Sequence, residues 1–306
     1  MTERSDNVIL GHTLGTPNMT VIEAIRLFRK VGLDGAEVIF RDDYESAIPE
    51  HSDINYWNDL NEELKKIGLP VVALTPYMHG YSSLEEEERV ESERSLIRAM
   101  ECAEALGAKH IRIYAGQSFY DDDADTRSRR EQIFVETMKR CATSAFDRGI
   151  SLNIENHFRT LCETATDTAR IVKWVDSPAV NILYDQPNID FVSGEPYQEA
   201  IEAQKGRISY VHVKDFVWVD DRRDFSASRV ERVSLNERIV RSRVPGQGIM
   251  DWPGIIRCLL SAGFDGPFSL EAEIRWHPED LPEPEETFLQ GKLYLMHLLS
   301  GLKKVR

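Results

Sequence analysis

Short runs of apolar residues alternate along the chain with longer segments in which apolar residues recur every three to four positions. The short runs cover residues 8–14, 36–40, 71–75, 109–115, 151–158, 180–185, 208–213 and 267–271. The longer segments cover residues 20–30, 53–67, 84–106, 124–148, 164–175, 196–205, 251–263 and 284–304. This pattern predicts eight buried strands, each followed by a helix.

Eight strand–helix repeats predict an α/β protein built as one (β/α)8 TIM barrel, with residues 1–306 as a single domain. An open, doubly wound sheet is the main alternative. Its first turn usually carries GxGxxG, whereas residues 12–17 read HTLGTP. Residues 216–243, after the seventh strand, are charged, rich in arginine and break the repeat. We expect them to form an inserted loop over the active-site face.

The composition of the chain argues against nucleic acid and membranes as partners. With 37 basic and 52 acidic residues the net charge is −15, which disfavours binding to nucleic acid. No run of about 18 apolar residues predicts a membrane span, and no signal peptide is predicted at the N-terminus. The four cysteines are scattered and form no CxxC pair, so we expect a reduced, cytoplasmic protein.

Four consecutive predicted strands carry a polar residue at or near the C-terminal end: Glu155, Asp185, His212 and Glu271. The C-terminal ends of parallel barrel strands converge on one face, so these side chains should meet. Three crowded carboxylates would repel one another unless a cation lay among them. Three carboxylates and one imidazole suit Mn²⁺ best, with Mg²⁺, Co²⁺ or Zn²⁺ as alternatives. Glu273 competes with Glu271 as the fourth ligand, and we prefer Glu271.

The same segments resemble the xylose isomerase-like barrels, a superfamily of sugar and sugar-phosphate isomerases and epimerases. The resemblance rests on residues 154–157 (IENH), 184–188 (YDQPN), 212–215 (HVKD), 245–251 (PGQGIMD) and 266–271 (GPFSLE). It implies one divalent metal held by Glu155, Asp185, His212 and Glu271, with the two glutamates as the acid/base pair. It also implies dimers or tetramers. Inosose dehydratases carry a similar PGxGxxD segment.

The chemistry of such a site leads us to expect a metal-dependent isomerase or epimerase. Proton transfer beside a carbonyl needs a base and an acid around the reacting carbon, and a metal can stabilise the negative charge that develops. A ketose, another sugar or a cyclitol would be the substrate. A lyase, either an inosose-type dehydratase or an eliminase cleaving an oxidised glycoside, would use the same site. A non-catalytic sugar-binding barrel and a nucleic-acid hydrolase are further alternatives.

Five residues are candidates for substrate binding: His157, Asn188, His79, His12 and Arg275. His157 matches a substrate-contacting histidine of the resembled family. Asn188 stands where some relatives carry a histidine, and this departure argues against the branch that cleaves DNA with three zinc ions. His12 and His79 follow predicted strands. Arg275 could bind a phosphate or carboxylate group of the substrate.

Overall fold

A computed structural model describes residues 8–116, 122–219 and 238–303 of the chain. Eight parallel strands form a closed barrel, in which β1 pairs with both β2 and β11 and so joins the two ends of the sheet. The barrel strands are β1 (Ile9–His12), β2 (Gly35–Phe40), β4 (Val71–Pro76), β5 (His110–Ile113), β6 (Ser151–Glu155), β7 (Val180–Tyr184), β8 (Ile208–Val213) and β11 (Phe268–Leu270). The predicted barrel is therefore confirmed.

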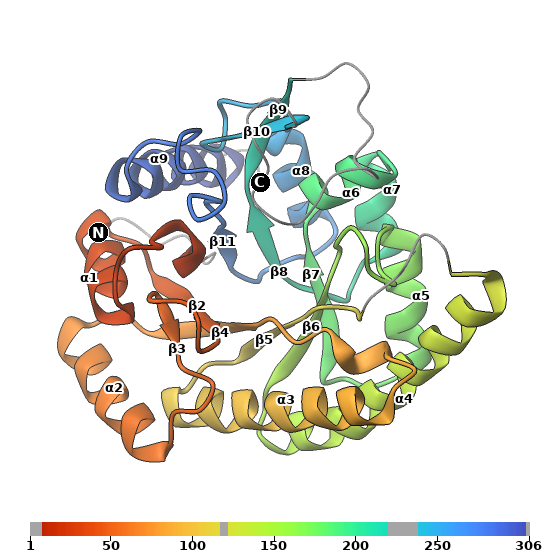
Figure 1. Cartoon of the computed structure of the whole chain (residues 1–306). Helices are drawn as coiled ribbons and strands as arrows, with labels where there is room; N and C mark the ends of the chain where they lie inside the picture. The colour runs from red at the N-terminus through yellow and green to blue at the C-terminus, as the bar shows by residue number, and fades with distance from the viewer. Residues whose placement is uncertain (1–7, 117–121, 220–237, 304–306) are drawn as a thin grey trace.

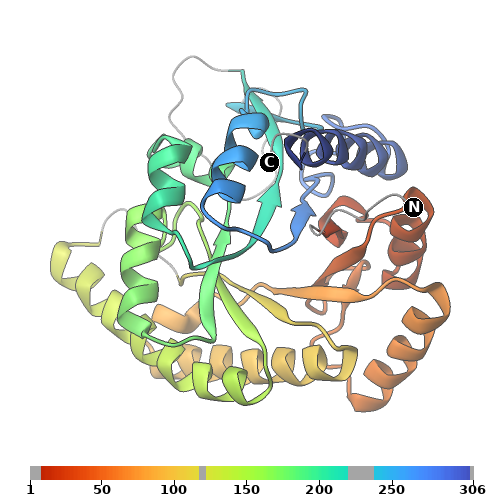
Figure 2. The same cartoon turned by 180° about the vertical axis from the view of Figure 1, so that it is seen from behind.

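Helices surround the strands, as the two opposite views show (Figures 1 and 2). They are α1 (Val21–Val31), α2 (Ile54–Ile67), α3 (Glu86–Leu106), α4 (Ala124–Asp147), α5 (Ala165–Val175), α6 (Gln186–Val192), α7 (Tyr197–Ala203), α8 (Trp252–Ser261) and α9 (Pro284–Lys303). Two 3₁₀ turns, η1 (Thr13–Gly15) and η2 (Gly80–Ser82), follow β1 and β4. None of the helices in the described ranges is long and apolar enough to cross a membrane.

Local sequence signals explain where the helices begin and end. Thr20 and Glu23 form a capping box at the start of α1, each satisfying a backbone N–H at the helix terminus. Gly32 ends α1 in the left-handed conformation at φ 77°, which costs glycine little. Asp251 caps α8 by accepting from the Gly254 N–H at 3.0 Å. These signals set the helix ends, and because all the barrel strands are parallel their C-termini share one face.

Two short strand pairings outside the barrel lie at that face. β3 (Ala47–Ile48) pairs in parallel with the C-terminal end of β2. β9 (Asp215–Trp218) and β10 (Val240–Arg243) pair as an antiparallel ribbon after β8. The ribbon is formed from the two ends of the predicted 216–243 insertion. Its central residues, 220–237, lie outside the described residues, so their role as a loop over the site stays a prediction.

Candidate metal and catalytic site

The four residues at the predicted strand ends lie together at the barrel mouth. Glu155 ends β6, Asp185 follows β7, His212 is in β8 and Glu271 follows β11. One ligand atom from each side chain lies within 4.8 Å of the ligand atoms of the other three. Glu155, Asp185 and His212 are buried, and Glu271 is only partly accessible. Sequence-distant oxygens and an imidazole nitrogen therefore converge on one point.

One ring nitrogen of His212 faces this cluster, and the other faces a buried carboxylate outside it. Its Nδ1 lies 3.2 Å from Glu155 Oε1, 3.5 Å from Asp185 Oδ2 and 3.3 Å from Glu271 Oε2. Its Nε2 lies 3.1 Å from each oxygen of Glu37. A carboxylate behind a histidine fixes the ring orientation and makes the opposite nitrogen a better ligand.

Glu37 is a functional residue that the sequence analysis missed. It is fully buried in β2, where Thr75 and Tyr210 hydroxyls donate to its Oε1. His12 Nε2 lies 3.7 Å from the same oxygen. The signal that could have found Glu37 is one charged residue inside the apolar run 36–40, because an unpaired charge is costly in a core.

Arg112 in β5 was also missed. Its Nε donates to Glu155 Oε2 at 2.6 Å, its Nη2 pairs with the same oxygen, and both side chains are almost fully buried. The guanidinium lies 5.2 Å from the ring centre of Tyr77 and 5.1 Å from that of Tyr114. Arg112 thus engages one oxygen of Glu155 and leaves Oε1 directed at His212.

Lys214 supplies the second fixed cation of the site. Its Nζ lies 2.9 Å from Asp185 Oδ2 and 2.8 Å from Glu271 Oε2. Glu273 is 3.7 Å from the same ammonium and accepts a hydrogen bond from Ser242 at 2.9 Å, so it lies beside the cluster.

The buried charges of the site do not balance. Four carboxylates (Glu37, Glu155, Asp185 and Glu271) stand against the fixed cations Arg112 and Lys214, which leaves two negative charges when the imidazoles are neutral. An excess of two negative charges suits a divalent cation.

Electrostatics keep the glutamates ionised. Burial alone would raise the pKa of Glu155, but the Arg112 guanidinium outweighs burial and holds that pKa well below its usual range. Burial likewise opposes ionisation of Glu271, and His212 and Lys214 reverse the effect and lower its pKa. Burial would lower the pKa of His212, yet the carboxylates of Glu271 and Glu37 raise it well above its ordinary value.

Two buried atoms support the fit of a metal to this donor set. His212 Nδ1 has no hydrogen-bond partner in the described part of the chain, although three carboxylate oxygens lie 3.2–3.5 Å from it. Asp185 Oδ2, one of those oxygens, also pairs with Lys214. Buried polar atoms are nearly always hydrogen-bonded or bound to an ion. One nitrogen and three carboxylate oxygens form a donor set suited to Mn²⁺, Mg²⁺ or Zn²⁺. The residues present therefore fit the implied divalent ion.

The predicted substrate residues lie at different depths around the cluster. His12 is fully buried, and its ring centre is 5.6 Å from that of His212. The His79 and His157 rings both contact Tyr114, at 4.7 and 4.9 Å between ring centres. Burial lowers the pKa of His79 to about 4 and lowers that of His157. Both imidazoles are therefore neutral near pH 7, which suits hydrogen bonding to sugar hydroxyls.

Asn188 lies in the first turn of α6 and is next to the cluster, but is not one of its four residues. Its Nδ2 donates to the Asn156 carbonyl at 3.0 Å, and its backbone N–H donates to Asp185 Oδ1 at the same distance. Its buried Oδ1 has no hydrogen-bond partner among the described residues. Asn188 thereby helps to orient Asp185, and one acceptor stays free for a substrate hydroxyl.

Asp215, next to Lys214, holds a neighbouring loop in place. Its carboxylate accepts from the backbone N–H groups of Gly246, Gly248 and Met250 at 2.9–3.1 Å. Burial raises the pKa of Asp215. This one side chain fixes the 245–250 segment, which the resemblance had marked out, against the end of β8.

Comparisons with known proteins agree on one family. Residues 25–294 match the model of the xylose isomerase-like TIM barrel family. An inosose dehydratase of Geobacillus thermodenitrificans is 26% identical over 167 residues, which are 53% of this chain and 53% of that protein, so the match spans about half of that relative's length. The crystal structure of 3-keto-D-glucoside 4-epimerase from E. coli is 18% identical, with a TM-score of 0.72 over 95% of this chain and 99% of that one. The IOLI protein with a bound zinc atom is 17% identical, with a TM-score of 0.76 over 96% of this chain and 98% of that one. The chain belongs to the xylose isomerase-like TIM barrel family.

Proposed function

We propose that the protein is a divalent-metal-dependent isomerase or epimerase that moves a proton at a carbon beside the carbonyl of a ketose, another sugar or a cyclitol. The observation that carries this proposal is the convergence of Glu155, Asp185 and Glu271 on His212 Nδ1. The site would hold one divalent ion, with Mn²⁺ as the first choice. When bound, the ion would stabilise negative charge developing on the carbonyl oxygen.

The two glutamates would move the proton. Glu155 ends β6 and Glu271 follows β11, three positions apart around the barrel, and Asp185 and His212 come from the two strands between them. In epimerisation, one carboxylate removes the proton as the C–H bond breaks, and the other delivers a proton to the opposite face of the same carbon. Exchange with water then restores both carboxylates. His157, His79, His12 and Asn188 would orient the hydroxyl groups.

Dehydration is the second candidate, and the inosose dehydratase relative favours it. It shares the first step, removal of the proton beside the carbonyl. Hydroxide is then lost from the next carbon and takes up a proton, so that water and an unsaturated ketone form. The two candidates differ only in the fate of the same deprotonated substrate.

Proton exchange in D₂O, followed by NMR, tests the shared step. The Mn²⁺-loaded protein is incubated with ketohexoses, ketopentoses and inososes. We expect deuterium to enter one substrate and exchange to fall at least about 100-fold in Glu155→Gln and Glu271→Gln. Glu273→Gln is the matched control, because its carboxylate lies beside the cluster. New ultraviolet absorbance of an unsaturated ketone would assign the lyase reaction.

A protein that binds Mn²⁺ tightly and exchanges no substrate proton would contradict the proposal. In that case a sugar-binding barrel without catalytic activity would be the better description. Equal exchange in the wild type and both glutamine variants would instead exclude these glutamates as the acid and base.

A further inference from the structure

Arg275 is a half-buried cation that has no counter-ion among the described residues. Its Nε is buried and has no hydrogen-bond partner, and none of the described residues forms an ion pair with its guanidinium. Other half-buried arginines have acceptors: Arg130 pairs with Asp122, and Arg98 and Arg207 donate to backbone carbonyls. In a chain with a net charge of −15, an unpaired guanidinium in a protected position is conspicuous.

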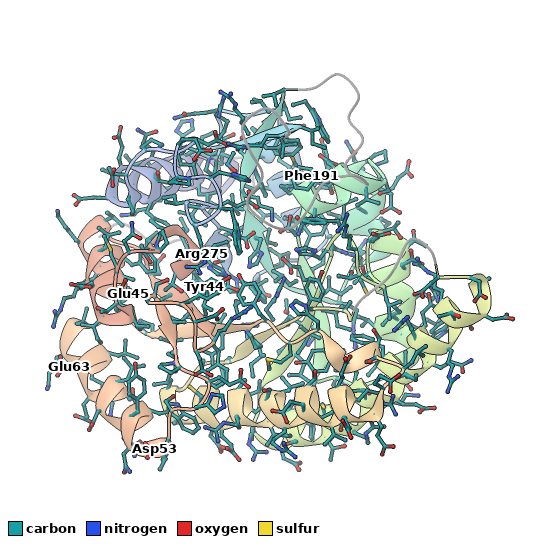
Figure 3. The ribbon with its side chains drawn as sticks, in the orientation of Figure 1. Tyr44, Glu45, Asp53, Glu63, Phe191 and Arg275 are labelled. Carbon is teal, nitrogen blue, oxygen red and sulfur yellow. The ribbon has the colours of Figure 1, made fainter. Side chains whose placement is uncertain are left out.

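The Arg275 side chain is nevertheless held in place. Its guanidinium lies over the ring of Tyr44, 3.5 Å from the ring centre, and 5.7 Å from the ring centre of Trp276. Figure 3 shows Arg275 and Tyr44 side by side. Stacking on an aromatic ring fixes the plane of a guanidinium while its N–H groups stay available at the edge. Arg41 also lies near Tyr44, at 5.4 Å, but Asp43 neutralises it.

A continuous row of contacts connects Arg275 to the catalytic cluster. Tyr44 stacks on Tyr77 with ring centres 5.7 Å apart and an angle of 22° between the planes. Tyr77 also lies 5.2 Å from the guanidinium of Arg112, which pairs with Glu155. Arg275 also lies four residues after Glu271 in the chain. Tyrosine rings and guanidinium groups thus form one wall from the reacting centre to the edge of the mouth.

From this arrangement we propose that the substrate carries an oxyanion group, a carboxylate or a phosphate, and that Arg275 receives it. The inference rests on the proposed function and narrows its substrate class to acidic or phosphorylated sugars and cyclitols. The reacting carbonyl would lie at the carboxylate cluster. The oxyanion would lie at the other end of the molecule, along the tyrosine wall.

The charges of the site support this orientation. With a divalent ion bound, Arg112, Lys214 and the ion balance the four carboxylates, so the cluster has no excess positive charge for an anionic group, whereas Arg275 does. Arg275 offers two parallel N–H donors that match a carboxylate or a phosphate. Tyr44 restricts the side chain before the substrate arrives, so little rotational freedom is lost on binding.

Matched pairs of substrates test the proposal in the D₂O exchange assay. Each neutral ketose or inosose is compared with a ketose carrying a terminal carboxylate and with one carrying a terminal phosphate. We expect the acidic member to exchange at a lower KM. In Arg275→Gln that KM should rise roughly 10- to 100-fold with kcat nearly unchanged, while the neutral member is unaffected. Arg275→Lys should fall in between, and Arg29→Gln on the exposed face of α1 is the control.

Calorimetric titration of the Mn²⁺-loaded protein separates this proposal from the proposed function. Binding of an acidic sugar that depends on Arg275 would support the oxyanion position even if no proton exchanged. Exchange of neutral substrates with equal KM for both members of each pair would leave the proposed function intact and overturn the oxyanion position. Equal weakening of neutral and acidic substrates by Arg275→Gln would also overturn it, because Arg275 would then bind a hydroxyl group. Tighter binding of the carboxylate-bearing or of the phosphate-bearing sugar would show which of the two groups Arg275 receives.

Discussion

Glu155, for which we propose a role in proton transfer, is a charged residue inside the barrel core. Its carboxylate is almost fully buried, and Arg112 is the partner that makes this burial tolerable. A buried ion pair contributes little net stability compared with an apolar pair, yet breaking one is costly because a charge is left alone. Retention of such a pair in a barrel core therefore argues for a functional requirement.

The first prediction follows from that pair. We expect Arg112→Met to lower the free energy of unfolding of the metal-free protein by about 3–5 kcal/mol, because Glu155 loses its cation. Urea denaturation measures the change. Arg140→Met is the control, since its pair with Glu93 is exposed and should contribute no more than about 1 kcal/mol. Equal losses in the two variants would show that the burial of Arg112 is energetically unimportant.

At the scale of elements, α6 orients the candidate metal ligand Asp185, which follows β7. Asp185 is the N-cap of this helix, and its Oδ1 accepts from the Asn188 N–H at 3.0 Å. Its other oxygen, Oδ2, faces His212 and Lys214. Capping thus fixes the side-chain rotamer and leaves one oxygen directed at the cluster. The same helix carries a second acid, the half-buried Asp190, which accepts a hydrogen bond from Gln186 Nε2 at 2.7 Å.

Asp190 makes the stability of the folded protein depend on pH. Burial raises its pKa to about 6, whereas the unfolded chain has a pKa near 4. The folded state therefore holds this proton more tightly, and the contribution of Asp190 to stability falls as the pH rises from about 4 to 6. We expect Asp190→Asn to stabilise the protein by about 1–2 kcal/mol at pH 8 and progressively less towards pH 4.

Thermal unfolding of the wild type and Asp190→Asn between pH 4 and pH 8 measures this difference. The substitution keeps an acceptor for Gln186, so the hydrogen bond is preserved while the charge is removed. Asp59→Asn, on the exposed face of α2, is the control and should shift the melting temperature equally at all pH values. A stabilisation by Asp190→Asn that did not change with pH would exclude the charge as its cause.

At the scale of the whole molecule, the barrel and the convergence of the strand ends could be predicted from the chain. The alternation of strands and helices is strong, and the C-terminal ends of barrel strands always share a face. Glu37 and Arg112 could not be predicted as site residues, because their partners lie 175 and 43 residues away and no local pattern reports such pairing. The seven-residue α6 was missed because it is short and contains Pro187.

The charge balance of the whole site leads to the last prediction. In the metal-free protein the raised pKa of His212 keeps its ring protonated, so Arg112, Lys214 and His212 leave one of the four carboxylate charges uncompensated. This charge opposes folding, and a divalent cation that replaces the His212 proton would remove the penalty. After treatment with a chelator, addition of Mn²⁺ to about 100 times its Kd should stabilise the protein by about 2.7 kcal/mol and raise Tm by roughly 4 °C. Differential scanning fluorimetry measures this shift. Asp185→Asn should abolish most of it, whereas Glu273→Gln should retain it. An unchanged Tm in the wild type, with Mn²⁺ shown not to bind, would mean that Lys214, Arg112 and the protonated His212 suffice to balance the site.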